Sequence, residues 1–414
     1  MFSCFGKHVI SSSKFLYRCI SHFRHPHPGD KVIVAMSGGV DSSVSAYLLK
    51  RQGYVVEGAY MRNWDTTDES GVCTSDQDWK DVQTVCKQLD IPCRQFDFIK
   101  EYWLQVFTRM IEDYENGITP NPDVMCNREI KFGWFLDKCL GSINSKDKEN
   151  TWIATGHYVQ LERTDSGRVK LIRGVDVTKD QSYFLSTVAE ENLQRVVFPV
   201  GNLHKKQVKS IAREANLETA NKKESMGICF VGKKRKFSEF LEQYVALKPG
   251  DIKTLDGTII GQHRGLFSYT IGQCARIHYG SDRWFVLRKD IKNNSLIVVP
   301  GSANPLLFSS KLVAKDWIWS WSEPPKGIEG GNDIYFDEIK SKYNNNIRVL
   351  GINLLTQLRY QQPPELCKIT KRFDGKYKVE FSTPKRAITP GQNVVVWDGN
   401  WCLGSGIIEQ PLIN

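Results

Sequence analysis

Short apolar runs alternate with helical periodicity from Lys31 to about residue 155, and this alternation most constrains the fold. The first strand pattern, at residues 31–36, ends in a Gly-rich turn, and an apolar helical stripe then runs to Gly53. Strand patterns recur at residues 54–60 and 152–155, and helices are expected at 75–89, 101–115 and 128–140. Strand–helix alternation of this kind predicts an α/β domain with a parallel sheet covered on both faces.

The pattern of apolar residues changes after about residue 300, where helical periodicity is weak and Pro and Gly residues recur along the chain. Residues 368–373 and 376–381 flank an Asp-Gly pair, and so do residues 394–397 and 401–403. A tight Asp-Gly turn between apolar runs predicts a β-hairpin, so a small antiparallel barrel or sandwich is expected here. The expected divisions are a targeting segment at 1–29, the parallel-sheet domain at 30–232, a central linker domain at 233–305 and the β-barrel at 306–414.

The composition is that of a multidomain globular protein. The 414 residues exceed what one hydrophobic core usually organises, and 41% hydrophobic with 25% charged residues is ordinary for folded domains. No run approaches the roughly 18 apolar residues that a membrane span needs. The eleven cysteines include no C-x-x-C pair, which argues against a zinc site and a disulfide framework and favours free thiols.

The first 29 residues contain no Asp or Glu, although they carry Lys7, Lys14, Arg18 and Arg24 with serines between them. A basic, Ser-rich, acid-free start is typical of a mitochondrial targeting segment, so location in the matrix is predicted. A disordered basic tail is the alternative. The net charge of +10 fits such a segment or a protein that binds polyanions.

The turn after the first strand reads Ser37-Gly38-Gly39-Val40-Asp41-Ser42-Ser43. A Gly-rich turn between a strand and a helix lets backbone N–H groups and the helix N-terminus approach phosphates. No Gly-Lys-Ser/Thr follows, and the third glycine of a dinucleotide fingerprint is missing, so two common phosphate motifs are excluded. The alternative is an ordinary turn in which Asp41 or Ser42 merely caps the helix.

Two cysteines lie in distinctive segments. Cys126 follows the stiff Thr119-Pro120-Asn121-Pro122 approach, and it is expected where a helix begins, beside Arg128 and Lys131. A helix N-terminus and nearby cations both favour a thiolate, so Cys126 is the best candidate nucleophile among the eleven cysteines. The alternative is a buried cysteine that merely precedes a helix. Cys229 lies in the apolar run at residues 225–230 and, taken alone, is typical of a core strand.

Seven motifs occur in one order along the chain. They are S-G-G-V-D-S at 37–42, T-P-N-P-D at 119–123 with Cys126, A-T-G-H-Y at 154–158, K-D-Q-S-Y-F at 179–184, G-I-C-F at 227–230, T-P-G-Q at 389–392 and G-S-G-I-I-E-Q at 404–410. In these motifs and their order the chain resembles the tRNA-specific 2-thiouridylases of mitochondrial type, which belong to the PP-loop ATP pyrophosphatase superfamily. The resemblance covers nearly the whole chain after residue 30.

The resemblance implies a PP-loop domain, a small central domain and a C-terminal β-barrel that binds tRNA. It implies that the wobble uridine of mitochondrial tRNAs is 2-thiolated after ATP adenylates the carbon-2 oxygen of uracil. AMP and pyrophosphate would be the products, with Mg²⁺ on the pyrophosphate. Sulfur would come from a cysteine persulfide loaded by an external donor, a cysteine desulfurase or a sulfur carrier. The implied substrates are the mitochondrial Lys, Glu and Gln tRNAs.

Residue roles follow from the same resemblance. The catalytic set would be Asp41, the nucleophile Cys126 and the persulfide carrier Cys229. ATP would bind Ser37, Gly38, Gly39, Val40, Asp41, Ser42, Met61 and Gly156. The tRNA or its target base would contact Asn121, Pro122, Asp123, His157, Lys179, Asp180, Gln181, Arg359, Tyr360 and Gln392.

Several points stay open in the sequence. Cys126 could release hydrosulfide from the persulfide or form a transient disulfide with Cys229. Residues 201–240 hold ten Lys/Arg against four Glu, a stretch that could bind RNA phosphates or be a solvated surface.

Two places depart from the family pattern, namely Cys274-Ala275 where basic residues are usual, and Met226 before Gly227. Another PP-loop enzyme, either an amide-forming synthetase or a lysidine-type ligase, and a non-catalytic tRNA-binding protein are the rival functions.

Overall fold

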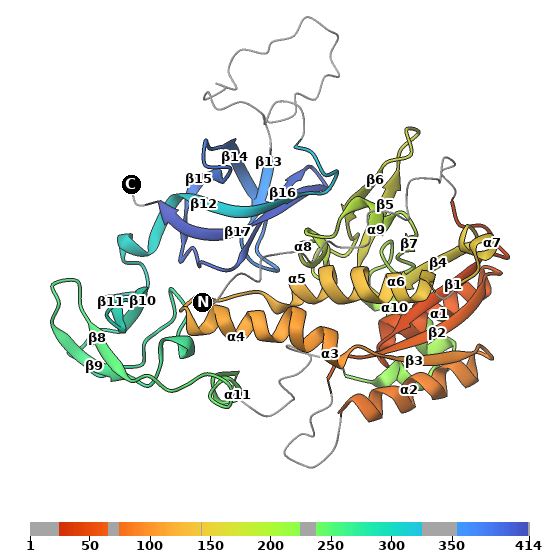
Figure 1. The fold of residues 1–414 in the computed structure, drawn as a ribbon, viewed down its shortest axis with the longest axis horizontal. Coiled ribbons are helices and arrows are strands. Elements are labelled where there is room, and N and C mark those ends of the chain that lie inside the picture. Colours follow the sequence, from red (N-terminus) through yellow and green to blue (C-terminus); the bar gives the residue numbers. More distant parts are fainter. Residues whose placement is uncertain (1–24, 65–73, 142, 224–236, 325–353, 413–414) are drawn as a thin grey trace, which may run out of the picture.

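The strands of the described residues form three sheets (Figure 1). The computed structural model describes residues 25–64, 74–141, 143–223, 237–324 and 354–412. A five-stranded parallel sheet, a four-stranded sheet and an eight-stranded sheet follow one another along the chain, except for one early hairpin that belongs to the third sheet. The expected parallel sheet, central domain and antiparallel barrel are therefore all present.

The parallel sheet has the strand order β3-β2-β1-β4-β7. Its strands are β1 (Lys31–Met36), β2 (Val55–Arg62), β3 (Cys93–Asp97), β4 (Thr151–Thr155) and β7 (Val196–Val197). Ile33 and Ala35 of β1 pack into one buried cluster, whereas Val32 and Val34 pack into a second cluster on the other face. Successive side chains of a strand point to opposite faces, so a continuous apolar run marks a strand covered on both sides.

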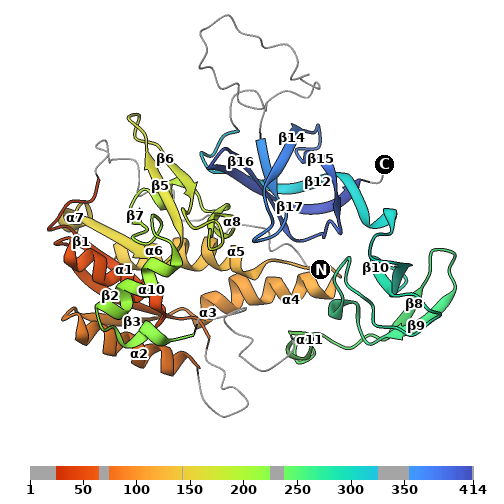
Figure 2. The same cartoon turned by 180° about the vertical axis from the view of Figure 1, so that it is seen from behind.

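Helices cover both faces of this sheet. One buried cluster includes side chains of α1 (Val40–Arg51), α2 (Thr74–Gln88) and α10 (Lys205–Glu214). The other includes side chains of two long helical segments. The first consists of α3 (Ile99–Tyr102), η2 (Trp103–Phe107) and α4 (Thr108–Glu115), and the second of α5 (Pro122–Cys126), η3 (Asn127–Trp134) and α6 (Phe135–Gly141). In both views of the ribbon, α4 and α5 lie side by side and extend from the parallel sheet toward the central sheet, with the barrel alongside them (Figures 1 and 2). The shorter helices are α7 (Ser145–Lys148), α8 (Ser182–Leu185), α9 (Glu190–Leu193) and α11 (Phe237–Leu241).

The second long segment corrects one expectation. The helix that carries Cys126 was expected to begin near that residue, but α5 begins at Pro122, and Asn121 is its N-cap. The Asn121 side chain accepts a hydrogen bond from the Val124 N–H at 3.3 Å. Proline is favoured at the first helical position because its missing N–H is not needed there. Cys126 is therefore the last residue of α5, one turn into a helix that continues through η3.

The central sheet has the order β10-β11-β8-β9 and a small core of its own. Its strands are β8 (Gly250–Lys253), β9 (Ile259–His263), β10 (Trp284–Asp290) and β11 (Ser295–Pro300). Cys274 pairs with Phe285 at its edge, and Ala275 is buried in the core. The departure at Cys274-Ala275 therefore falls partly on an interior position, which no phosphate could reach.

The third sheet closes into a barrel because β12 pairs with both β15 and β17. Its strands are β12 (Phe308–Trp319), β13 (Leu354–Gln357), β14 (Glu365–Lys371), β15 (Tyr377–Arg386), β16 (Asn393–Asp398) and β17 (Trp401–Leu412). The two Asp-Gly hairpins are confirmed as β14–β15 and β16–β17. Trp317 and Trp319 pack on Tyr377 with ring centroids 5.0 and 5.5 Å apart, so these tryptophans stabilise the barrel.

A hairpin from the first domain extends the barrel sheet. It consists of β5 (Val159–Arg163) and β6 (Val169–Arg173), and Ile172 of β6 pairs with Trp401 of β17. The Arg173 guanidinium lies 3.9 Å from the ring centroid of Trp397. The first domain and the barrel are thus joined through a sheet, which the domain divisions expected from sequence do not show. None of the helices formed by the described residues has the length and apolar character to cross a membrane.

Candidate active site

The Gly-rich turn adopts a conformation that leaves a helix N-terminus uncapped by any side chain. Gly38 has φ +71°, and a Cβ on it would lie 2.7 Å from the Asp78 carbonyl oxygen, so only glycine fits. Gly39 is the N-cap of α1 and makes no side-chain cap hydrogen bond. The Ser42 hydroxyl bonds within the turn instead, accepting from the Ser37 N–H and donating to the Gly39 carbonyl, both at 3.2 Å. The first turn of α1 is therefore available for an anion.

Asp41, in the first turn of α1, does not cap the helix. Its Oδ1 accepts hydrogen bonds from the Tyr158 hydroxyl at 2.7 Å and from the Lys205 ammonium at 2.6 Å. The Lys205 ammonium also reaches Oδ2 at 2.8 Å. The sequence does not reveal that Tyr158 and Lys205 bind Asp41, because they lie 117 and 164 positions away from it.

A second lysine holds the turn from the other side. The Lys222 ammonium donates to the Gly38 carbonyl at 2.9 Å and to the carboxylates of Asp78 and Asp81 on α2. Burial lowers the pKa of Lys222, but its bonds to Asp78 and Asp81 outweigh burial and raise that pKa. Lys205 and Lys222 belong to the basic stretch at 201–240, so two of its ten cations bind protein carboxylates.

Gly156 lies directly against the turn. A Cβ on Gly156 would lie 2.8 Å from the Ser42 backbone nitrogen and 2.9 Å from the Asp41 carbonyl carbon. The turn can therefore occupy its position only if residue 156 has no side chain. Met61, at the end of β2, is partly buried against the neighbouring core cluster.

His157 lies inside the domain. Its ring packs between Phe132 and Phe198, with centroids 5.8 and 6.1 Å away, and its Nδ1 is 2.7 Å from the Thr155 hydroxyl. Burial, with a smaller contribution from Lys131, holds the pKa of His157 well below its ordinary value. The expected contact of His157 with tRNA stays a prediction, and the structure places a neutral imidazole in the core.

The helix that begins at Pro122 presents Asp123 and Cys126 on one face. Residues three and four apart lie together on a helix, so these two side chains share their face with Ile130. Cys126 and Ile130 are both buried in the cluster beneath the parallel sheet. Burial raises the pKa of Asp123, and the nearby charge of Lys131 partly opposes this. Asp123 is therefore a carboxyl group that is protonated more easily than usual, one turn before the candidate nucleophile.

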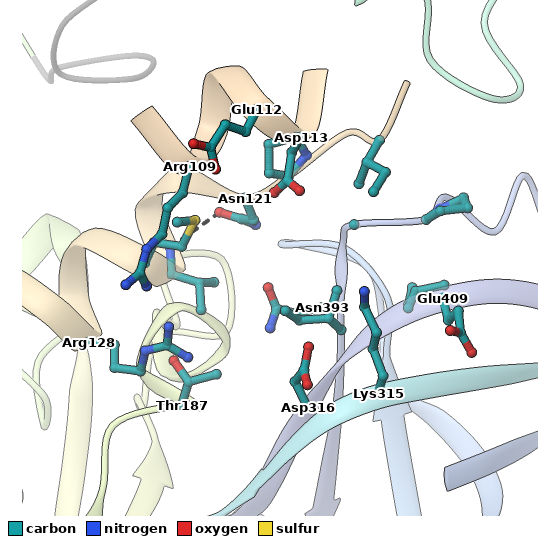
Figure 3. A pocket seen from close by; sticks show the side chains of 18 residues that line it. Arg109, Glu112, Asp113, Asn121, Arg128, Thr187, Lys315, Asp316, Asn393 and Glu409 are labelled. Atoms are coloured by element: carbon teal, nitrogen blue, oxygen red, sulfur yellow. Dashed lines mark hydrogen bonds between the residues drawn. The ribbon is translucent and has the colours of Figure 1, made fainter. Parts of the chain in front are cut away.

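The opposite face of the same helix lines a cavity of about 550 Å³. Figure 3 shows Arg109, Asp113, Asn121 and Arg128 facing Lys315, Asp316 and Asn393 of the barrel region across this cavity. Neither Asp123 nor Cys126 lines it, and no residue of the Gly-rich turn does. The cavity thus separates the barrel from the back of the helix that carries the candidate nucleophile.

The barrel holds the start of this helix directly. The Thr119 N–H donates to the Pro390 carbonyl at 3.1 Å, and the Gln392 side-chain amide donates to the carbonyls of Thr119 and Pro120 at 2.8 and 3.1 Å. Gly391 has φ +92°, and a Cβ on it would lie 2.8 Å from the Thr119 carbonyl oxygen. The turn at residues 389–392 therefore fixes the segment that leads into Asn121 and Cys126.

Replacing Gln392 with alanine is expected to lower the free energy of unfolding by about 1–3 kcal/mol, because two part-buried carbonyl groups lose their donor. The catalysed reaction should slow, whereas binding of an anionic ligand at the Gly-rich turn should be unchanged, since that turn does not touch residue 392. Thermal unfolding and nucleotide titration measure the two effects. Gln410→Ala, an exposed glutamine on the same barrel, is the matched control. Equal stability of the two variants would contradict this role.

The remaining expected tRNA contacts bind protein groups in this structure. The Asp180 carboxylate accepts hydrogen bonds from Arg173, from the Gly174 N–H and from both the N–H and the hydroxyl of Ser182. The Gln181 side chain accepts from the Tyr158 N–H at 3.0 Å, next to the Asp41 network. Lys179 precedes this pair, and its N–H donates to the Asp176 carbonyl at 2.9 Å.

Arg359 and Tyr360 lie where the barrel meets α8. Arg359 donates to the Ala387 carbonyl at 2.6 Å, and the Tyr360 ring lies 4.4 Å from Phe184, centroid to centroid. Stacking of Tyr360 on a base would therefore have to extend or replace its contact with Phe184. Cys229, Met226 and the basic run at 233–236 lie outside the described residues.

Three family models match successive parts of the chain. They are the tRNA methyl transferase HUP domain at residues 30–233, the tRNA methyl transferase PRC-barrel domain at 238–300 and the aminomethyltransferase β-barrel domain at 333–408. The tRNA-specific 2-thiouridylase MnmA of Lysinibacillus sphaericus is 44% identical over 92% of this chain and 94% of its own length. This chain belongs to the tRNA-specific 2-thiouridylase family. The protein of the same name from Levilactobacillus brevis is 46% identical over 92% of this chain and 95% of its own length.

Membership of the 2-thiouridylase family makes the chain a tRNA sulfurtransferase that uses ATP, and the site fits that nucleotide. The uncapped N-terminus of α1 can bind phosphates, and Gly38 and Gly156 allow the turn before it to pack closely against its neighbours. Among the described residues, no group of three or more His, Cys, Asp or Glu could hold a metal. Mg²⁺ commonly binds one or two carboxylates together with substrate phosphates, so Asp41 and the nucleotide oxygens would share it.

Proposed function

We propose that this protein 2-thiolates the wobble uridine of mitochondrial tRNAs through a persulfide mechanism. The observation that carries the proposal is the arrangement of the uncapped α1 turn with Asp41, in a chain whose similarity to 2-thiouridylases covers 92% of its length. Cys126 contributes the thiol on α5, and Cys229 is the proposed carrier of the sulfur.

The proposed reaction has two steps, adenylation of the uracil and transfer of sulfur to it. The carbon-2 oxygen of the uracil attacks the α-phosphate of ATP, and pyrophosphate leaves. Sulfur then bonds to carbon-2, and AMP leaves with the original oxygen. The terminal sulfur of a Cys229 persulfide supplies this atom, and the thiol of Cys126 takes its place on Cys229, so that a disulfide remains for an external thiol to reduce. The sulfur passes either as free hydrosulfide or directly from the persulfide.

The protein's own residues have separate tasks in this scheme. The backbone of residues 37–42 would bind phosphate oxygens, and Asp41 would hold a magnesium ion that neutralises charge on these phosphates. Asp123 has a raised pKa because of burial, so it can hold a proton near the reacting base. The contacts of Thr119 and Pro120 with the barrel orient the helix that begins at Pro122. Asp123 and Cys126 consequently face away from the cavity between this helix and the barrel.

The purified protein, given ATP, Mg²⁺, a cysteine desulfurase, cysteine and an unmodified mitochondrial Lys, Glu or Gln tRNA, is expected to form 2-thiouridine. Retardation of the tRNA in a mercury-containing gel measures the product. Asp41→Asn should release no tRNA-dependent AMP or pyrophosphate, because the carboxylate that binds magnesium is lost. Thiolation of other tRNAs alone would contradict the proposed substrates, and pyrophosphate release without thiolation would favour a different PP-loop enzyme. A protein that binds tRNA but releases no pyrophosphate would be non-catalytic.

We also propose that residues 1–29 direct the protein to the mitochondrial matrix. Support comes from the absence of acidic residues there and from the family model, whose match begins at residue 30. Residues 1–35 fused to a fluorescent protein are expected to produce a mitochondrial signal that depends on the membrane potential. Changing Lys7, Lys14, Arg18 and Arg24 to glutamine should abolish import. A cytosolic or secreted signal from the unchanged fusion would contradict this location.

A further inference from the structure

The ion pair between Asp41 and Lys205 stands out in the nucleotide site, because both carboxylate oxygens bind the same ammonium. The Nζ atom of Lys205 lies 2.6 and 2.8 Å from Oδ1 and Oδ2, and it also lies 5.6 Å from the centroid of the Tyr158 ring. The Lys205 side chain is 10% exposed, whereas that of Asp41 is 32% exposed. The lysine therefore approaches from the protein interior, and the carboxylate keeps one open side.

The backbone holds Lys205 ready for this contact. Lys205 is the first residue of α10, and its N–H donates to Asp176 Oδ2 at 2.9 Å. The N–H of His204, the N-cap of α10, donates to the Gln207 side-chain oxygen at 2.8 Å, and the Gln207 N–H donates to the His204 carbonyl at 2.9 Å, so the same turn is fixed. Since the main chain is fixed, the ammonium can move only by rotation about the side-chain bonds of Lys205.

Magnesium and the ammonium would need the same oxygens. Mg²⁺ binds carboxylate oxygens at about 2.0–2.1 Å, and a divalent cation at Asp41 would repel a neighbouring ammonium. The phosphates of the nucleotide would be the nearest new anions, and lysine binds phosphate readily as a compact charge. An ammonium that leaves Asp41 would therefore have a partner within reach of the same side chain.

We propose that Lys205 is a positioning residue for adenylation, which holds the Asp41 carboxylate until Mg²⁺·ATP binds and then moves to a phosphate oxygen. This inference rests on the proposed function of the site. Lys205 would act twice. It compensates the charge of Asp41 before the nucleotide arrives, and it adds a cation to the phosphates afterwards.

Binding of α,β-methylene-ATP, which cannot be cleaved at the α–β position, tests this without tRNA or sulfur. Calorimetry would give its affinity at a series of Mg²⁺ concentrations for the full chain and its variants. In Lys205→Met, the Mg²⁺ concentration that gives half of the maximal increase in nucleotide affinity should fall about tenfold, because the ammonium no longer competes for Asp41. Affinity at saturating Mg²⁺ should weaken about 10- to 100-fold, the value of one hydrogen bond to a charged group.

Two further variants complete the test. Lys205→Gln keeps a donor for Asp41 without the charge, so it should show the same two shifts and replaces the methionine variant if that variant does not fold. Lys206→Met, an exposed neighbour on α10, should change neither quantity. Unchanged Mg²⁺ dependence in folded Lys205 variants would overturn the proposal, including the case in which affinity falls equally at every Mg²⁺ concentration. Failure of the unchanged protein to bind the nucleotide would instead overturn the proposed function, and this inference with it.

Discussion

Replacing Gly156 with alanine is expected to weaken binding of α,β-methylene-ATP about 10- to 100-fold and to reduce pyrophosphate release at least as much. The added Cβ would lie 2.8 Å from the Ser42 nitrogen and 2.9 Å from the Asp41 carbonyl carbon, and both are backbone atoms that cannot rotate away. Overpacking of this kind typically costs about 1–3 kcal/mol, which corresponds to this range of affinity if the turn is displaced. Calorimetry and a pyrophosphate assay would measure the two effects.

Gly141→Ala provides the matched control, because no atom lies within 4 Å of a Cβ at that position and its φ is not positive. It should leave both quantities unchanged. Normal pyrophosphate release by Gly156→Ala would show that the turn tolerates displacement. The close approach of residue 156 would then have no part in nucleotide binding.

Serine in place of Cys126 or Cys229 is expected to reduce thiolation by about a thousandfold or more, but at different steps, because each variant loses a nucleophilic thiol that the other keeps. Cys229→Ser should accept no labelled sulfur from a cysteine desulfurase. Cys126→Ser should accept the label on Cys229 and fail to pass it to tRNA. Both variants should still bind the nucleotide, since neither residue belongs to the turn at 37–42.

Cys274→Ser, a half-buried cysteine of the central domain, is the control and should thiolate tRNA normally. Label retained by Cys229→Ser but lost from Cys126→Ser would reverse the two assigned roles. Full thiolation by either variant would contradict the two-cysteine mechanism.

Local patterns in the sequence determined much of the fold and part of the site. The strand at residues 31–36, the turn after it and the first helix are all set by contiguous residues. The Asp-Gly hairpins at 374–375 and 398–399 follow from turn chemistry within about ten residues. The start of α5 was also readable, because an Asn followed by Pro is a typical N-cap and first helical position. Two prolines so close together also fit an extended segment, with the helix beginning near Cys126, which is the expectation that the structure corrects.

Only the tertiary structure determined which charged side chains pair at the Gly-rich turn. Lys205 and Lys222 were read from sequence as part of a basic stretch, yet they bind Asp41 and the Asp78–Asp81 pair, 164 and at least 141 positions away. Sequence spacing carries no information about such contacts, because the parallel sheet brings α1, α2 and α10 together only after folding. A lysine that pairs with a carboxylate of the protein and a lysine that binds RNA look the same in composition.

The junction between the domains was likewise decided by the folded chain. Gln392 reaches Thr119 across 273 positions, and β6 joins the barrel through Ile172 and Trp401. Motif order in the sequence predicts which residues to expect at the site, and contiguous patterns predict the parallel sheet and the antiparallel barrel. Their mutual placement depends on hydrogen bonds and packing between distant segments, which form only when both partners are already folded, so no local pattern could predict it.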